Sequence, residues 1–239
     1  MKSLKSIIAL ILIISGFVVQ ASVPILREVP VDHVYSPKGF DSNDNSEIVI
    51  EGYLPNLCHK SPQAKVVIKD KVIDIKVKSL YYHESNPFCP EMIVPFMKVV
   101  DLGVLDKGDY KILVNGSSPF EIKDELFINE SVSDSVDEFV YANVEYIEKN
   151  YNNRIIHLRG YNPSDCFVLD KIEVVDDGKD VYSILPKMKQ ISDFCPMKMQ
   201  SFDYEMEVPR HLMSDKVLLH VRGMDGKSVN SIFHNKIYE

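Results

Sequence analysis

The sequence has no tryptophan and few glycines, 10 in 239 residues. Phosphate-binding loops and dinucleotide fingerprints need glycine at fixed spacings, and neither pattern occurs. The nucleophile elbow and the His-Glu-x-x-His metal motif are absent as well. The chain therefore shows no local catalytic template, which argues against an enzyme but leaves open a catalytic set assembled from distant residues.

Basic residues are outnumbered by acidic ones, 27 to 35. Residues 1–21 contain two lysines and no acid, so the chain without them has 25 basic and 35 acidic residues, a net charge of −10. Such a surface repels nucleic-acid phosphates and anionic lipid headgroups. We therefore expect no nucleic-acid partner, and another protein or a surface glycan as the binding partner. The sequence does not set an oligomeric state.

Long apolar runs are also absent, apart from residues 7–19 near the start of the chain. Lys2 and Lys5 precede this run, and Val-Gln-Ala precedes Ser22, which is the layout of a secretory signal peptide. The run is shorter than the roughly 20 residues that a membrane-spanning helix needs. We therefore predict a signal peptide at 1–21, export to the periplasm or the exterior, and no membrane insertion of the mature chain.

One motif occurs twice in the sequence. GYLPNLC at 52–58, with FCP at 88–90, returns as GYNPSDC at 160–166 with FCP at 194–196. A repeat of about 107 residues is the size of a small domain. The sequence therefore predicts two copies of one domain in tandem.

All four cysteines lie in this repeat, two in each copy. In an exported protein an even number of cysteines is typical of a disulfide framework, and four allow three connectivities. Because each copy should fold alone, the duplication selects Cys58–Cys89 and Cys166–Cys195. Neither pair has the spacing of a redox or zinc motif, so we expect no thiol catalysis and no structural metal.

The repeat sets the predicted domain boundaries. An extended lead-in is expected at 22–30, a first β-sandwich at 31–123, an acidic linker at 124–135 and a second β-sandwich at 136–239. The stretch 124–139 is also compatible with one helical turn.

Short strands are the dominant local pattern. Ile48 and Ile50 alternate with polar or opposite-facing neighbours, and the alternation at 202–208 is the clearest in the chain. Asn, Asp and Gly at 36–46 predict turns, and the Asp-Asp-Gly at 176–178 predicts a hairpin. Outside the leader no stretch has a convincing helical period. The pattern predicts an all-β fold with a sandwich in each half.

The segment from Leu105 to Tyr110, LDKGDY, resembles the Asp-x-Gly-x-Tyr corner of immunoglobulin-like domains. The resemblance covers about a dozen residues and implies a fold class: two tandem immunoglobulin-like β-sandwiches. In such domains the tyrosine hydroxyl bonds back to nearby backbone at the start of the penultimate strand. The second copy departs from the motif, with Asp215 and Val217 at the positions of Gly108 and Tyr110.

The most interesting local cluster is Tyr81, Tyr82, His83 and Glu84, just before the first Phe-Cys-Pro. On a disulfide-held loop these side chains would form a recognition patch, because tyrosine offers a large contact area at low entropic cost. The alternative is one tyrosine packed under the loop and a solvated His-Glu pair, and we favour this alternative.

Met188, Met197 and Met199, with Cys195 nearby, raise the possibility of a soft-metal site, because thioethers bind Cu(I). The simpler interpretation is that Met197 and Met199 pack on one face of a strand. We favour packing, and expect no metal and no cofactor.

These observations favour an exported, non-enzymatic binding or adhesion-type protein that presents loops from two rigid sandwiches. One alternative is a structural or assembly component of the cell envelope that works through β-edge pairing. Another is a secreted hydrolase or protease inhibitor.

Overall fold

A computed structural model describes residues 23–82, 88–133, 139–150 and 153–235. Over these ranges the regular elements are strands, apart from a short 3-10 turn at Met224–Gly226. No helix in the described part of the chain is long and apolar enough to cross a membrane. The all-β prediction is confirmed.

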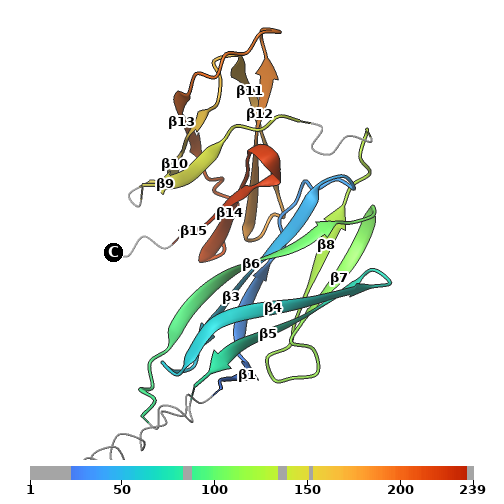
Figure 1. Ribbon diagram of the computed structural model, residues 1–239, viewed down its shortest axis with the longest axis vertical. Coiled ribbons are helices and arrows are strands. Elements are labelled where there is room, and N and C mark those ends of the chain that lie inside the picture. The colour runs from blue at the N-terminus through green and yellow to red at the C-terminus, as the bar shows by residue number, and fades with distance from the viewer. Residues whose placement is uncertain (1–22, 83–87, 134–138, 151–152, 236–239) are drawn as a thin grey trace, which may run out of the picture.

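The first half of the chain forms a sandwich of two sheets (Figure 1). One sheet has the order β2-β3-β6, and the other has the order β1-β5-β7-β8 with β4 on the open side of β5. A core that includes Ile48, Ile50 and Ile112 fills the space between them. The strands are β1 (Ile25–Glu28), β2 (Val31–Tyr35), β3 (Asn45–Leu54), β4 (His59–Lys69), β5 (Val72–Tyr81), β6 (Val94–Val104), β7 (Gly108–Val114) and β8 (Ile122–Ile128).

The second half repeats this arrangement. Its sheets have the orders β9-β10-β13 and β11-β12-β14-β15, and a separate core that includes Ile156, Leu158 and Leu219 lies between them. The two tandem β-sandwich domains are therefore confirmed. The strands are β9 (Val144–Lys149), β10 (Ile155–Asn162), β11 (Phe167–Asp176), β12 (Val181–Gln190), β13 (Gln200–Glu207), β14 (Lys216–Arg222) and β15 (Ser228–His234).

Each domain contains one parallel strand pair. β5 runs parallel to β7, and β12 runs parallel to β14. Parallel neighbours need a crossover, and β6 and β13 provide it by passing through the opposite sheet. The antiparallel sheets of constant-type immunoglobulin domains have no such pair. The strand order thus differs from that pattern in the same way in both copies.

The tyrosine corner is present in the first domain. The Tyr110 hydroxyl donates to the Asp106 carbonyl oxygen at 2.9 Å, at the start of the penultimate strand β7. Lys71 Nζ reinforces the turn by donating to the same carbonyl at 3.0 Å and to the Tyr110 oxygen at 2.8 Å. Val217 in the second domain is instead fully buried in the core.

Both disulfides pair as the duplication predicts, Cys58 with Cys89 and Cys166 with Cys195. In each domain the first cysteine directly precedes an edge strand, β4 or β11, and the second lies in the segment that leads into β6 or β13. Each bridge therefore ties the two sheets of one sandwich together at one end.

Two predicted boundaries are corrected by the strands. β8 runs from Ile122 to Ile128, so the last strand of the first sandwich continues into the stretch expected to be a linker at 124–135. Leu126 and Ile128 are buried, which explains why this acidic stretch is a strand. The lead-in at 22–30 contains β1, which pairs with the end of β5.

The glycine of the repeated Gly-Tyr motif has a steric role. A Cβ on Gly52 would overlap the Pro30 carbonyl oxygen, and one on Gly160 would overlap the Asn143 carbonyl oxygen. The neighbouring strand thus passes too close to the backbone for any side chain at these positions.

We expect Gly160→Ala to lower the free energy of unfolding by about 1–3 kcal/mol, because the neighbouring backbone must shift to admit a methyl group. Chemical denaturation of the two proteins measures this loss. Gly223→Ala is the matched control, since its Cβ would meet only ordinary contacts at 3.5 and 3.6 Å. Equal stability of the two variants would contradict the steric explanation.

Candidate functional site

The outer face of β3 is covered by the second domain. The alternating pattern predicts that Glu47, Val49 and Glu51 face solvent, yet Val49 is fully buried. It packs with Tyr35 of β2 against β12 and β14 of the second sandwich (Figure 1). We name this contact the junction strip; its members are Tyr35, Val49, Val181, Leu218 and Ile232.

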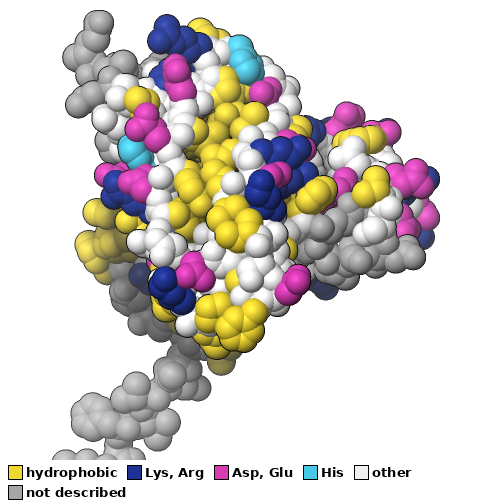
Figure 2. Space-filling view, turned by 90° about the horizontal axis from the view of Figure 1, so that it is seen from above, with side chains coloured by type: hydrophobic (Ala, Val, Ile, Leu, Met, Phe, Trp, Pro, Cys, Tyr) yellow, Lys and Arg dark blue, Asp and Glu magenta, His cyan; other side chains and the backbone are white. Residues whose placement is uncertain are grey.

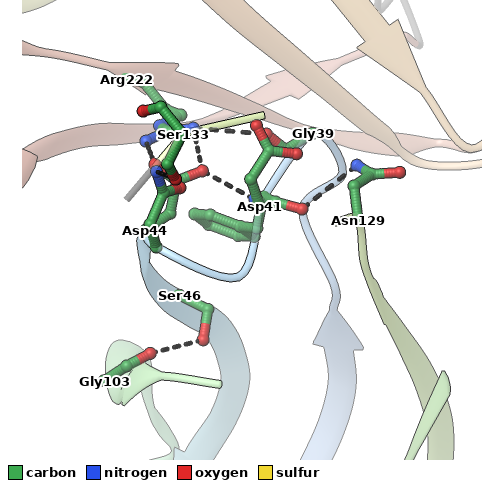
Figure 3. Close-up of polar contacts among 10 residues, drawn as sticks. Gly39, Asp41, Asp44, Ser46, Gly103, Asn129, Ser133 and Arg222 are labelled. Atoms are coloured by element: carbon green, nitrogen blue, oxygen red, sulfur yellow. Dashed lines mark hydrogen bonds and ion pairs between the residues drawn. The ribbon is translucent and has the colours of Figure 1, made fainter. Parts of the chain in front are cut away.

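A buried ion pair lies beside the junction strip. The Arg222 guanidinium donates two hydrogen bonds to the Asp44 carboxylate, at 2.8 and 2.5 Å, and both side chains are almost fully buried (Figure 3). The same guanidinium donates to the Gly39 carbonyl oxygen at 3.2 Å and lies over the Tyr141 ring. This bidentate pair joins the turn before β3 to the end of β14.

Glu47 adds a second polar contact between the domains. Its carboxylate accepts hydrogen bonds from Ser228 at 2.5 Å and Asn230 at 2.7 Å, and His220 lies 3.4 Å away. Burial alone would raise the pKa of Glu47, but the hydrogen bonds from His220, Ser228 and Asn230 hold it below its ordinary value. Glu47 is therefore a charged acceptor within the junction.

The edges of the junction are tied as well. Lys216 forms an ion pair with Glu51, and the Lys38 backbone N–H donates to the Ser183 hydroxyl at 2.9 Å. The surface between the two domains thus combines apolar contacts, a buried ion pair and a hydrogen bond from the backbone. The two sandwiches are held in a defined arrangement by these contacts.

A cleft of about 410 Å³ lies at this junction, and we name it the junction cleft. Both domains and the segment between them form its walls. The lining residues are Lys38, Gly39, Asp41, Phe127, Asn129, Phe139, Tyr141, Glu173, Val175, Asp176, Leu185 and Lys187. Ligand sites occur preferentially at domain interfaces and within this range of volumes.

The floor of the cleft depends on the polar turn at 36–46. Gly39 has a φ of +85°, a conformation that favours glycine. The Asp41 backbone N–H donates to Asp44 at 2.7 Å, and Asn129 donates to the Phe40 carbonyl oxygen (Figure 3). The turn is therefore locked to the ion pair and to the end of β8.

The cleft combines aromatic faces with fixed charges. Lys187 Nζ lies 3.5 Å from the centroid of the Phe139 ring and 3.2 Å from the Glu173 carboxylate. Hydrogen bonds from Lys171 and Lys187 lower the pKa of Glu173, so this acid is charged at neutral pH. Phe127 and Phe139 remain partly exposed in the cleft. Such a surface suits non-covalent binding of a ligand with an apolar face and polar edges.

The predicted patch at 81–84 is only partly within the described residues. Tyr81 ends β5, where the Arg27 guanidinium lies 4.1 Å from its ring centroid and the His59 ring packs beside it. The Tyr82 N–H donates to the Cys58 carbonyl oxygen. Tyr81 thus packs against the Arg27 and His59 side chains. His83 and Glu84 lie outside the described residues, so recognition by this loop stays a prediction.

The methionines near the second disulfide differ from expectation. Met188 is buried in the second core, but Met197 is 97% exposed and Met199 is largely exposed. The interpretation that Met197 and Met199 pack in a core is therefore wrong, because the disulfide loop holds them outside the sandwich. Cys195 is in a disulfide and supplies no thiolate. Within the described ranges, no group of three or more His, Cys, Asp or Glu residues is placed to hold a metal ion.

Comparison with known proteins supports the sandwich class in the first domain. The family model described as "ORF11 beta-sandwich domain" matches residues 48–122, which run from within β3 to the start of β8. Comparisons with curated proteins and with solved structures found no match. The sequence similarity thus indicates a fold for part of the chain and no activity.

Proposed function

We propose that the protein is an exported, non-enzymatic binding protein of the adhesion type, built from two tandem immunoglobulin-like modules that hold a ligand in the junction cleft. The observation that carries this proposal is that residues from both domains and the segment between them line one cleft. A ligand there contacts three parts of the chain whose relative positions are already fixed. Preorganisation of this kind lowers the entropic cost of binding.

The two disulfides support the proposed location outside the cytoplasm. Two disulfides persist in oxidising surroundings outside the cytoplasm. Together with the leader-like start of the sequence, they favour a protein of the periplasm or the exterior. The expected ligand is another protein or a surface glycan, because aromatic faces such as Phe127 and Phe139 accept either a sugar ring or an apolar side chain.

The alternative of assembly through β-edge pairing is weakened at two of the edge strands, β4 and β11. β4 has a bulge between Lys60 and Gln63, and it carries Pro62 and two further lysines. β11 has a bulge between Leu169 and Lys171. Bulges, proline and lysine are the features that block pairing with another chain. The third alternative, a secreted hydrolase or protease inhibitor, has the weaker support, because the cleft lining described above is suited to binding.

The absence of tryptophan provides a direct test. Phe127→Trp places the chain's only tryptophan in the cleft, and we expect its emission to shift when glycan fragments or peptides from a screening panel bind. Phe120→Trp is the matched control, because Phe120 has similar exposure and does not line the cleft. Calorimetry on the unmodified protein identifies panel members that bind.

A binder that shifts the emission at position 127 and leaves position 120 unchanged supports the proposal. A binder that calorimetry detects and that leaves Phe127→Trp unchanged places the ligand elsewhere and overturns it.

A further inference from the structure

A second cleft lies on the outer face of the first sandwich, and we name it the basic cleft. Its volume is about 600 Å³, within the range of ligand sites. Three lysines line it although acidic residues outnumber basic ones in the chain. The residues that decide its character are Lys38, Lys111, Lys123 and Glu125 on the walls and Val72 and Leu113 on the floor.

The duplication shows why this face is open. Val72 of β5 pairs in register with Lys111 of β7, and the equivalent pair in the second domain is Val181 with Leu218. Val181 and Leu218 are fully buried, because they belong to the junction strip. Lys111 is exposed and Val72 is 38% exposed. The face that joins the domains in one copy therefore carries an exposed, charged cleft in the other.

Two of the three ammonium groups are free to pair with a ligand. Lys123 forms an ion pair with Glu121 at 2.9 Å. Across the residues that the structure describes, Lys38 Nζ and Lys111 Nζ have no hydrogen-bond or ion-pair partner, although Glu125 lies opposite Lys111 in the strand register. On the face shown in Figure 2, by contrast, basic side chains lie beside acidic ones. The basic cleft thus holds positive charge that the chain does not neutralise by contact.

The walls of the basic cleft are fixed. The Asp124 carboxylate accepts a hydrogen bond from the Ser36 hydroxyl at 2.6 Å, which ties β8 to the turn that carries Lys38. The Lys38 N–H is held by the Ser183 hydroxyl of the second domain. Lys111 lies on β7, between β5 and β8 in the sheet. A bound anion therefore meets an ordered backbone, which lowers the entropic cost of binding.

The basic cleft adjoins the junction cleft. Lys38 lines both. Lys123, Glu125 and Phe127 alternate along the exposed face of β8; the first two line the basic cleft and the third lines the junction cleft. β8 leads from the first sandwich toward the second (Figure 1). The two clefts thus form one track, with ammonium groups at one end and aromatic rings at the other.

We propose that this track binds a linear acidic glycan, a chain of sugars that bears carboxylate or sulfate groups. The inference rests on the proposed function and names the class of glycan. The anionic groups pair with Lys38 and Lys111, and sugar rings lie against Phe127 and Phe139. A neutral glycan makes no ion pair here, and a chain of acidic side chains has no ring face for the two phenylalanines.

Calorimetry with matched oligosaccharides tests the charge. Oligogalacturonate is compared with its methyl ester, and a carrageenan oligosaccharide with its desulfated form. The acidic member of at least one pair is expected to bind about tenfold more tightly than its neutral form, and added salt should reduce this difference. The pair that responds distinguishes carboxylate from sulfate. Equal binding of both members in both pairs, or no binding at all, overturns the inference.

Lysine variants locate the charge on the protein. Lys111→Gln and Lys38→Gln are each expected to weaken binding of the acidic oligosaccharide about 3- to 10-fold and to leave the neutral form unaffected. Lys227→Gln is the matched control, because Lys227 is an exposed lysine that lines neither cleft. An equal loss in all three variants would show that only the overall charge matters, which overturns the site.

Two further outcomes separate this inference from the proposed function. If a neutral oligosaccharide shifts the Phe127→Trp emission and its acidic form binds no more tightly, the junction cleft stands as a site and the acidic glycan is excluded. If the acidic oligosaccharide depends on Lys111 but leaves the Phe127→Trp emission unchanged, the continuous track and the junction cleft both fail. Polyglutamate that binds equally tightly, with the same loss in Lys111→Gln, overturns the choice of a glycan.

Discussion

Arg222→Ala is expected to lower the free energy of unfolding by about 3–5 kcal/mol, because it leaves the Asp44 carboxylate buried without its partner. The pair is almost fully buried and bidentate, and Arg222 also donates to the Gly39 carbonyl oxygen. Urea denaturation of the variant and the unchanged protein measures the loss. Asp44→Ala should be similarly costly, since it isolates a buried guanidinium.

The second domain offers a matched control in Arg159. This arginine forms ion pairs with Glu148 and Asp203 on the surface, with more than a third of each side chain exposed. Arg159→Ala should cost no more than about 1 kcal/mol, because exposed pairs are solvated. The double variant Asp44→Ala with Arg222→Ala should lose less than the sum of its two single changes, since no lone charge remains. Equal losses for Arg222→Ala and Arg159→Ala would show that the junction opens readily in solution.

Loss of one disulfide is the second large effect that we expect. Replacing Cys166 and Cys195 with serine should remove roughly 3–4 kcal/mol, because the bridge closes a loop of about 30 residues in the unfolded chain. The measurement is again denaturant unfolding, without reductant. Cys58→Ser with Cys89→Ser should have a similar cost, because the two loops are nearly the same length.

Reductant provides the control for this prediction. It should lower the melting temperature of the unchanged protein sharply and leave a variant without any of the four cysteines unaffected. An unchanged melting temperature with and without reductant would refute the stabilising role of the bridges.

Local patterns in the sequence predicted most of the fold. Alternation marks β3 and β13, and the Asp-Asp-Gly hairpin at 176–178 connects β11 to β12. The duplication predicted the disulfide pairing, because each copy contains two cysteines and should fold alone. No knowledge of long-range contacts was needed. The tyrosine corner could be predicted from the sequence, because Tyr110 and its acceptor Asp106 are only four residues apart.

The junction could not be predicted in this way. Val49 occupies a position that alternation assigns to solvent, and only the second sandwich makes it a buried residue. Asp44 and Arg222 are separated by 178 residues, so nothing local pairs them. The structure shows the covering strand in β12, whose residues from Val181 to Met188 are buried on both faces.

The candidate site was missed for the same reason. The cleft is lined by separate segments around Lys38, Phe127, Tyr141 and Lys187, none of which forms a motif. The exposed methionines were misassigned because hydrophobic character alone predicts burial. Their exposure depends on the loop that Cys195 anchors.

The stacking of one sandwich on the other has a consequence for biogenesis. As the chain folds, the amino-terminal sandwich can complete its own core once β8 is in place, but Tyr35 and Val49 stay exposed until β12 and β14 of the second sandwich cover them. During that interval the incompletely folded chain exposes the apolar surface around Tyr35 and Val49. The Asp44 carboxylate stays hydrated, because Arg222 has not yet paired with it. Chaperones that bind exposed apolar surface would therefore recognise this incompletely folded chain, whereas the folded protein buries the same surface.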